Sequence, residues 1–195
     1  MDNYFKIIGV IILLVFYTVY LGKMMLQKRK GIQTDQIAKG KEKGKRFYIE
    51  LVMKAATYTV VAAEVISIFA VTPSLPFPIL VIGVVLGFAG DVIFMMAVVT
   101  MRDSWRAGIA ENDKTEIITN GIYMWSRNPG FLGFDCVYLG LLLLFFHPLL
   151  LVFSVWAMVM LHLQILQEEK FLLQVFGGEY AAYQGRVCRY FGRKK

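Results

Sequence analysis

The chain has 195 residues, of which 57% are hydrophobic, and its formal net charge is +7. A soluble domain of this size is usually about 45–50% apolar, and the excess here lies in long runs, so the composition indicates an integral membrane protein. In such a protein the positive charge bears first on orientation rather than on nucleic-acid binding. The two cysteines, Cys136 and Cys188, lack metal-ligand spacing, and we expect no disulfide between them.

Five hydrophobic segments follow one another along the chain. They cover about residues 4–25, 48–71, 79–101, 131–146 and 149–166. The first three reach the roughly 20 residues with which a helix crosses the hydrocarbon core. The last two are shorter, and only His147 and Pro148 separate them, which predicts a helical hairpin. The first segment is too long for the apolar part of a signal peptide, so we expect a mature helix there.

Lysine and arginine are distributed unevenly over the connections between these segments. With five spans, nineteen of the 21 basic residues fall on one side of the membrane, and the positive-inside rule makes that side the cytoplasm. We therefore expect the N-terminus outside, the C-terminus and the site inside, and a location in a plasma membrane of bacterial type. The predicted fold class is all-α and membrane-integral: five transmembrane helices, the last two a short hairpin, and a cytoplasmic C-terminal helical segment after Gly177-Gly178.

Several polar features near the spans have structural interpretations. Residues 27–46 form a basic loop that we expect near anionic headgroups. Residues 102–120 are expected at the interface, with Trp105 near the headgroups. Glu64 and Asp91 lie inside the second and third spans, where we expect a hydrogen bond between the two helices, with lipid recognition as the alternative.

The first motif that could form a site is Ser126-Arg127-Asn128-Pro129, directly before the fourth segment. Pro129 suits the first helical turn and Asn128 suits the N-cap position. The structural interpretation is a capped helix start with an interfacial arginine. The functional interpretation is an anion site formed by the helix N-terminus and Arg127.

The second motif is Glu168-Glu169, which follows the fifth segment. Adjacent helical residues point about 100° apart, so one carboxylate can face water while the other faces the bundle and binds an ammonium or a ribose hydroxyl. A solvated flank is the alternative. Because a tight turn at His147-Pro148 makes the last two helices antiparallel neighbours, Arg127 and the glutamates would come within reach of one small zwitterionic ligand. His162, in the same segment, is expected to be a packing residue.

At these motifs the chain resembles a known family. GIYMWSRNPGFLG (121–133), QEEKFL (167–172) and FGGEYAAYQGRVCRY (176–190) are similar to the membrane-embedded methyltransferases that include isoprenylcysteine carboxyl methyltransferases and phospholipid N-methyltransferases. RDSWRAGI (102–109) resembles the stretch before the family's first motif. The resemblance covers about residues 101–190. We expect a single membrane domain over 1–195, with three generic N-terminal helices in 1–101 and a methyltransferase-like region in 102–195.

The resemblance implies S-adenosylmethionine as methyl donor and a lipophilic substrate that enters from the bilayer, with no nucleic acid and no metal as partner. The implied cofactor-binding residues are Tyr123, Arg127, Asn128, Pro129, Glu168, Glu169, Tyr180 and Tyr183. The resemblance also implies a basic residue, Arg186, near the reacting end of the substrate. On chemical grounds the expected catalytic residues are Arg186 or Arg189, which would orient an acceptor carboxylate, and Glu168, which with bulk water as the alternative would accept a proton from an acceptor amine. The oligomeric state stays open.

The chain also departs from the family pattern. Asn128 stands where the family usually has histidine, Phe131 where it has tyrosine, and Gln164 where some members have arginine. An asparagine can hydrogen-bond a cofactor but cannot act as an acid or base near neutral pH. The acceptor therefore stays open: it could be a prenylcysteine-like carboxylate, a phospholipid amine, a prenylated thiol or another isoprenoid. The alternative function is a non-catalytic lipid-binding or assembly protein that retains the fold. A transporter is disfavoured, because the charges concentrate at one surface.

Overall fold

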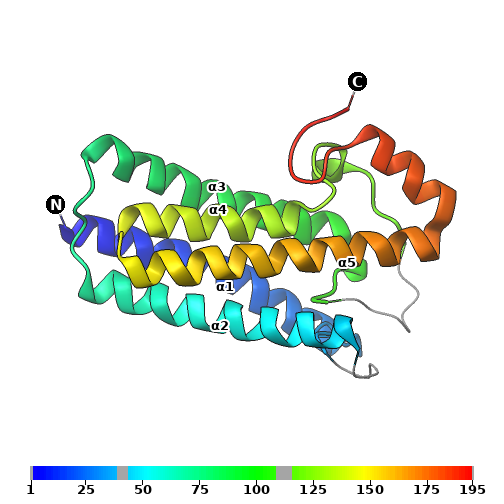
Figure 1. Cartoon of the computed structure of the whole chain (residues 1–195), viewed down its shortest axis with the longest axis horizontal. Helices are drawn as coiled ribbons and strands as arrows, with labels where there is room; N and C mark the ends of the chain where they lie inside the picture. The colour runs from blue at the N-terminus through cyan, green and yellow to red at the C-terminus, as the bar shows by residue number, and fades with distance from the viewer. Residues whose placement is uncertain (1, 39–43, 109–115, 195) are drawn as a thin grey trace.

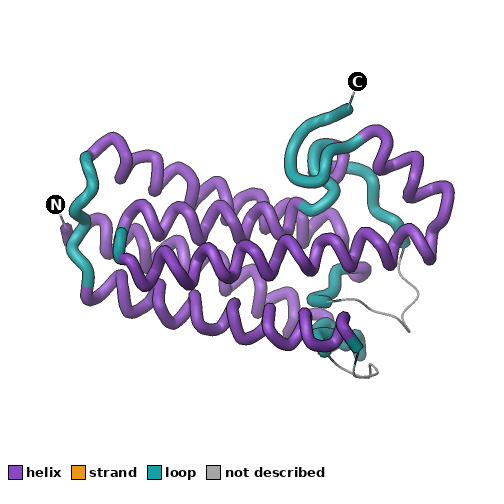
Figure 2. Tube along the Cα trace, in the orientation of Figure 1, coloured by secondary structure: helices purple, strands orange, loops and turns teal. Residues whose placement is uncertain are grey.

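The computed structural model describes residues 2–38, 44–108 and 116–194, and this part of the chain consists of helices and loops (Figures 1 and 2). The α-helices are α1 Asp2–Arg29, α2 Lys45–Ala70, α3 Phe77–Met101, α4 Pro129–Leu144 and α5 Pro148–Arg186. Two short 3-10 helices, η1 Arg102–Ser104 and η2 Gly121–Met124, follow α3 and precede α4. The predicted all-α fold is confirmed.

By length and composition, α1, α2, α3 and α5 can each cross a membrane. The fourth predicted span, α4, is apolar but has only 16 residues. The helices run along one long axis, and the N-terminus lies at the same end as the α2–α3 and α4–α5 connections (Figure 1). The opposite end carries residues 30–38, η2 and the C-terminal segment. The motif residues therefore gather at one end of the bundle.

The fifth helix extends beyond its hydrophobic segment. It continues through the glutamate pair to Arg186, with one non-helical residue, Gly177, so both glutamates lie on the helix. The hydrophobic run does end near Leu166, but the residues that follow it are good helix formers without proline or glycine until Gly177. The end of the hydrophobic run therefore marks an expected membrane boundary, whereas the helix itself continues beyond it.

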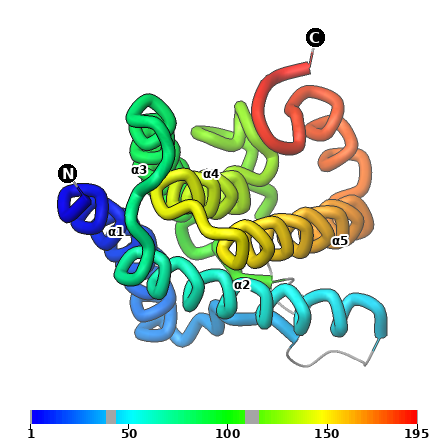
Figure 3. Tube along the Cα trace, turned by 60° about the vertical axis from the view of Figure 1, so that its left-hand side comes forward, coloured from blue at the N-terminus to red at the C-terminus, as the bar shows by residue number. Residues whose placement is uncertain are grey.

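The hairpin of α4 and α5 forms as predicted, but each helix packs more extensively on another neighbour. α4 lies between α3 and α5 (Figure 3) and makes its largest contact with α3, while α5 makes its largest contact with α2. The α3–α4 contact is close because glycines face each other across it. A Cβ added to Gly140 would lie 2.6 Å from the Gly87 nitrogen and 2.7 Å from the Gly83 oxygen. Close approach of two backbones requires residues without side chains.

Trp105 is buried, so its predicted place among the headgroups is wrong. Its ring lies 5.5 Å from the Tyr20 ring and 6.2 Å from the Phe94 ring, centroid to centroid. Its carbonyl accepts a hydrogen bond of 2.9 Å from Gln27 Nε2 at the end of α1. This bond draws the chain after α3 against α1. Part of the expected interfacial stretch, residues 109–115, and part of the basic loop, residues 39–43, lie outside the described residues.

The predicted hydrogen bond between Glu64 and Asp91 is also wrong. Both side chains are buried, but neither carboxyl has a hydrogen-bond partner in the described part of the chain. The physical reason is the packing order: α2 packs mainly on α5, whereas α3 packs mainly on α4 and next on α1. The two carboxyls therefore belong to different helix contacts.

Candidate functional site

The centre of the candidate site is a buried ion pair between Arg127 and Glu169. Arg127 Nη2 and Nε donate to Glu169 Oε1 at 2.7 and 3.1 Å, and both side chains are only 5% exposed. Arg127 lies just before α4, and Glu169 lies in α5, so the pair joins the two motifs that flank the hairpin. The prediction that these motifs meet is confirmed.

The same carboxylate also holds the C-terminal segment. Arg189 Nη2 and Nε donate to Glu169 Oε2 at 2.9 and 3.1 Å, and this hydrogen bonding raises the pKa of Arg189. Arg127 Nη1 donates to the carbonyls of Val187 at 2.7 Å and Gln184 at 3.3 Å. Glu169 and the three side chains that donate to it, Arg127, Asn128 and Arg189, are called the Glu169 cluster below. This cluster ties the C-terminal residues to the start of α4.

Asn128 occupies the predicted N-cap position, but its side chain does not cap α4. Its Nδ2 instead donates to Glu169 Oε1 at 3.0 Å and to the Arg189 carbonyl at 3.2 Å. A hydrogen bond to an ionised carboxylate is stronger than one between the side-chain amide and a neutral backbone N–H at the helix start. This difference explains why the Asn128 amide turns toward Glu169. Pro129 is the first residue of α4, as predicted, and its side chain is buried.

The tyrosines of the motifs are buried together beside this cluster. Gly177, at φ 51°, kinks α5, so that its last turns fold back with Tyr180 and Tyr183 against Tyr123 of η2. Tyr183 Oη donates to the Tyr123 carbonyl at 2.6 Å, and burial raises the pKa of Tyr123. The predicted helical segment after Gly177-Gly178 is confirmed, and its two tyrosines share one buried face.

Two of the charged residues predicted for the site, Glu168 and Arg186, lie outside the Glu169 cluster. Glu168 is partly buried and accepts a hydrogen bond of 2.9 Å from Gln164 Nε2, so Glu169 is the glutamate that faces the bundle. Arg186 is exposed at the end of α5. Of the two candidate arginines, the structure therefore places Arg189, and not Arg186, in contact with the cluster.

Sequence reasoning missed a second polar group deeper in the bundle. Tyr190 Oη and His162 Nδ1 are 2.6 Å apart, and their rings stack. Asp135 of α4 is buried, and its Oδ1 has no hydrogen-bond partner among the described residues. Burial is the main cause that raises the pKa of Tyr190, and the negative charge of Asp135 adds to it.

The spacing of these residues could have revealed them. Asp135 lies seven residues after Asn128, and His162 lies seven residues before Glu169, which is about two helical turns in each antiparallel helix. Residues seven apart lie on the same helix face. Starting from the Asn128–Glu169 hydrogen bond, both helices therefore place a titratable side chain about 10 Å further into the bundle. His162 is not the plain packing residue that the sequence predicted.

Two glutamines of α5 carry buried polar atoms that no described residue satisfies. These atoms are Gln164 Oε1 and both side-chain atoms of Gln167. Buried polar groups normally have partners, so orphaned atoms beside Glu168 and Glu169 are the places where an additional polar ligand would gain hydrogen bonds. Chemically, this end of the bundle offers oxygen acceptors for a cation or a hydroxyl and cationic donors for an anion.

Known proteins are similar to this part of the chain. Residues 81–174 match the family model described as the isoprenylcysteine carboxyl methyltransferase (ICMT) family. A protein-S-isoprenylcysteine O-methyltransferase of Saccharomyces cerevisiae is 36% identical over 74 residues, 36% of this chain and 30% of that protein. The Xenopus laevis protein of the same name is 30% identical over 111 residues, 55% of this chain and 38% of that protein.

A probable protein-S-isoprenylcysteine O-methyltransferase of Oryza sativa subsp. indica is 35% identical over 109 residues, 54% of this chain and 57% of that protein. The chain thus spans between about a third and somewhat over half of the length of these relatives. The family match begins within α3 and ends in α5, beyond the glutamate pair. Residues 81–174 of the chain are therefore similar to the isoprenylcysteine carboxyl methyltransferase family.

Proposed function

We propose that the protein is an S-adenosylmethionine-dependent methyltransferase that acts on a lipophilic acceptor. The observation that carries this proposal is the convergence of the motif residues at one end of the bundle, where Arg127 and Glu169 lie inside the region that matches methyltransferases. When bound, this cofactor supplies an electrophilic methyl group. The chain's own residues then have to bind the donor, align the acceptor and exclude water.

In this proposal the Glu169 cluster has a positioning role. Among the described residues, the Glu169 carboxylate accepts its hydrogen bonds from Arg127, Asn128 and Arg189, so the cluster fixes where α4, α5 and the C-terminal segment meet. The direct contacts to the cofactor come from groups with spare capacity. Gln164 Oε1 and the Gln167 amide suit an ammonium and ribose hydroxyls, and Glu168, which accepts a hydrogen bond from Gln164, lies beside them. Arg189, whose side chain is 37% exposed, suits a carboxylate.

The site is proposed to face the cytoplasm, because the basic residues concentrate at this end of the chain's spans. A soluble, charged cofactor would then enter from water and the acceptor from the bilayer. The location proposed is a plasma membrane of bacterial type. The matched relatives are named for isoprenylcysteine, so a prenylcysteine-like carboxylate is the first acceptor proposed, and a phospholipid amine is the second.

The acceptor classes make different demands on the protein. A carboxylate is already anionic at neutral pH and needs orientation, which Arg189 or the exposed Arg186 would supply. An amine, a thiol or a hydroxyl must lose a proton. Asp135 and the His162–Tyr190 pair are the titratable groups two turns from the Glu169 cluster, and Glu168 lies beside it. An acceptor that carries a proton would therefore find a base nearby.

The test is calorimetric binding of S-adenosylhomocysteine, the cofactor product, to the full chain purified in detergent. We expect binding that weakens about tenfold or more in Gln164→Leu, since a hydrogen bond to a charged group contributes roughly 1.5–3 kcal/mol. Gln174→Leu, an exposed glutamine on the same helix, is the matched control and should bind normally. No heat with folded protein at millimolar ligand would reject the enzyme proposal and favour the non-catalytic alternative. Normal binding by Gln164→Leu would reject the site assignment alone.

A further inference from the structure

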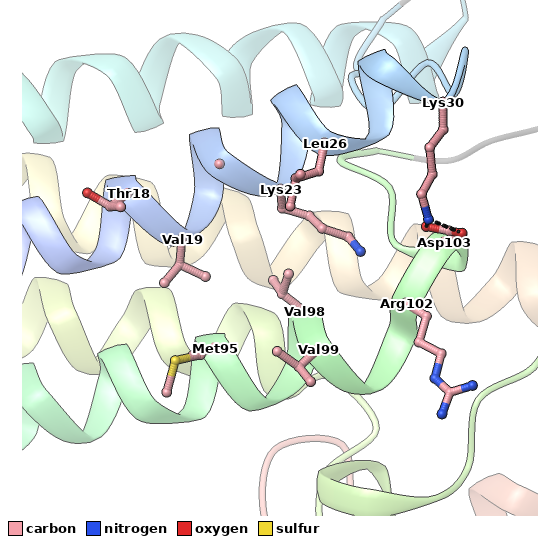
Figure 4. Close-up of a pocket in the computed structure, with 11 residues that line it drawn as sticks. Thr18, Val19, Lys23, Leu26, Lys30, Met95, Val98, Val99, Arg102 and Asp103 are labelled. Atoms are coloured by element: carbon pink, nitrogen blue, oxygen red, sulfur yellow. Dashed lines mark hydrogen bonds and ion pairs between the residues drawn. The ribbon is translucent and has the colours of Figure 1, made fainter.

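A groove of about 590 Å³ lies between α1 and α3, away from the Glu169 cluster, and it combines apolar walls with a cationic end (Figure 4). Its apolar lining comes from the two membrane-length helices: Val19, Leu26, Met95, Val98 and Val99. Leu26, Met95 and Val99 are also exposed on the bundle surface. The groove therefore opens where these two helices would face lipid.

The cationic end lies where α1 and α3 finish, beside η1. Lys23, Lys30, Arg102 and Asp103 line it. Lys30 Nζ and Asp103 Oδ2 pair at 2.8 Å (Figure 4), which leaves Lys23 and Arg102 without a hydrogen bond or ion pair to any other described residue. Lys23 feels the charge of Asp103 without pairing with it, so the two cations at the end of an apolar groove suit an anion that carries hydrocarbon.

The backbone at Arg102 supports a functional interpretation of this end. Arg102 has φ 48°, a conformation that is uncommon for a residue with a side chain and that occurs mainly where surrounding structure or function requires it. The residue ends α3 and places its guanidinium group at the end of the span. A glycine at position 102 would have avoided this cost.

We propose that this groove binds one anionic phospholipid, with its phosphate at Lys23 and Arg102 and an acyl chain along the apolar walls. The proposal uses the cytoplasmic orientation proposed above, which places the cationic end at the leaflet that carries anionic lipid. The two parts of the groove select this occupant together. Inorganic phosphate would leave the walls uncovered, and a zwitterionic lipid would bring its own cation to the lysine and the arginine.

Gly22 offers a way to test the apolar part separately. It lines the groove, and a Cβ added to it would meet nothing within 4 Å. Gly22→Leu would place a branched side chain in the path of the acyl chain without altering charge, and leucine favours the helix more than glycine does. Lys28 and Arg29 supply the matched charge control, because both are exposed in the last turn of α1 and neither lines the groove.

The experiment is native mass spectrometry of the full chain in detergent, with added phosphatidylglycerol or phosphatidylcholine of identical acyl chains. We expect one phosphatidylglycerol per chain to be retained in preference to phosphatidylcholine. Because each basic residue near an anionic lipid contributes roughly a fivefold effect, Lys23→Gln with Arg102→Gln should weaken phosphatidylglycerol retention about 25-fold. Lys28→Gln with Arg29→Gln should leave retention unchanged, and Gly22→Leu should reduce it strongly.

Three results would overturn the proposal. Equal retention of the two lipids by the unaltered protein would show that the cations do not select the headgroup. Equal loss of phosphatidylglycerol retention in the two double variants would show that retention depends on general surface charge rather than on the groove. Normal retention by Gly22→Leu would place the lipid outside the groove. None of these results bears on methyl transfer, which S-adenosylhomocysteine binding tests independently.

Discussion

The Glu169 cluster predicts unequal roles for the two arginines that share one carboxylate. Replacing Arg127 by glutamine would leave Glu169, which is 5% exposed, with only the partly exposed Arg189 as cationic partner. Breaking a buried ion pair typically costs about 3–5 kcal/mol, and the remaining arginine favours the lower figure. The Arg189 side chain is 37% exposed, so Arg189→Gln should cost about 1 kcal/mol or less.

Cys188 provides the assay for this difference. Cys188 is partly buried, and its carbonyl accepts a hydrogen bond of 3.1 Å from the Arg127 backbone N–H, so detachment of the C-terminal segment would make the thiol more accessible to maleimide. In a Cys136→Ser background, which removes the other cysteine, the labelling rate reports local opening. At about 1.4 kcal/mol per factor of ten, Arg127→Gln should accelerate labelling about 100-fold or more and Arg189→Gln about fivefold.

Arg193→Gln is the control for this assay, because it removes a charge from the same segment at an exposed position. We expect its labelling rate to stay close to that of the parent. The reasoning fails if Arg127→Gln and Arg189→Gln accelerate labelling equally, or if the Arg127 variant labels as slowly as the control. Either result would mean that burial does not set the strength of these pairs and that the segment is held by its apolar contacts.

Three further predictions concern binding and packing. Glu168→Ala should abolish S-adenosylhomocysteine binding in calorimetry without lowering expression, whereas Glu179→Ala, an exposed change on the same helix, should bind normally; equal affinities would remove Glu168 from the site. Gly140→Ala should lower the unfolding free energy by about 1–3 kcal/mol through overpacking against α3, and thermal unfolding should show no such loss for Gly130→Ala, whose added Cβ meets nothing. Tyr183→Phe should cost about 1–3 kcal/mol in the same measurement, because it leaves a buried carbonyl without its donor; an unchanged midpoint would contradict this.

The sequence predicted those features that follow from local patterns. Long hydrophobic runs located the helices, Pro129 located the start of α4, and Gly177 located the kink in α5. These predictions succeed because propensity and hydrophobicity act within a few residues. The fifth helix continues past its hydrophobic segment for the same reason, since hydrophobicity ends near Leu166 while helix propensity continues.

Contacts that depend on which helices pack together could not be predicted from the sequence. Glu64 and Asp91 were assigned to one contact because their helices follow each other along the chain, but α3 packs on α4 through glycines that allow close approach. Trp105 moved from the interface to the interior because Gln27 binds its carbonyl. Pairings of this kind depend on the register between helices, which hydrophobic periodicity does not fix.

The structure also changes the meaning of the departure at Asn128. The absence of the family's histidine suggested a protein that had lost catalysis, because an amide cannot transfer protons near neutral pH. In the structure, however, residue 128 serves as a hydrogen-bond donor to Glu169 Oε1 and to the Arg189 carbonyl. These two contacts require only a hydrogen-bond donor, and an amide nitrogen supplies one without titrating. The departure therefore leaves the Glu169 cluster intact and is weak support for the non-catalytic alternative. If the acceptor carries a proton, the base has to come from another residue, and Asp135, His162 and Glu168 are the groups whose positions suit that role.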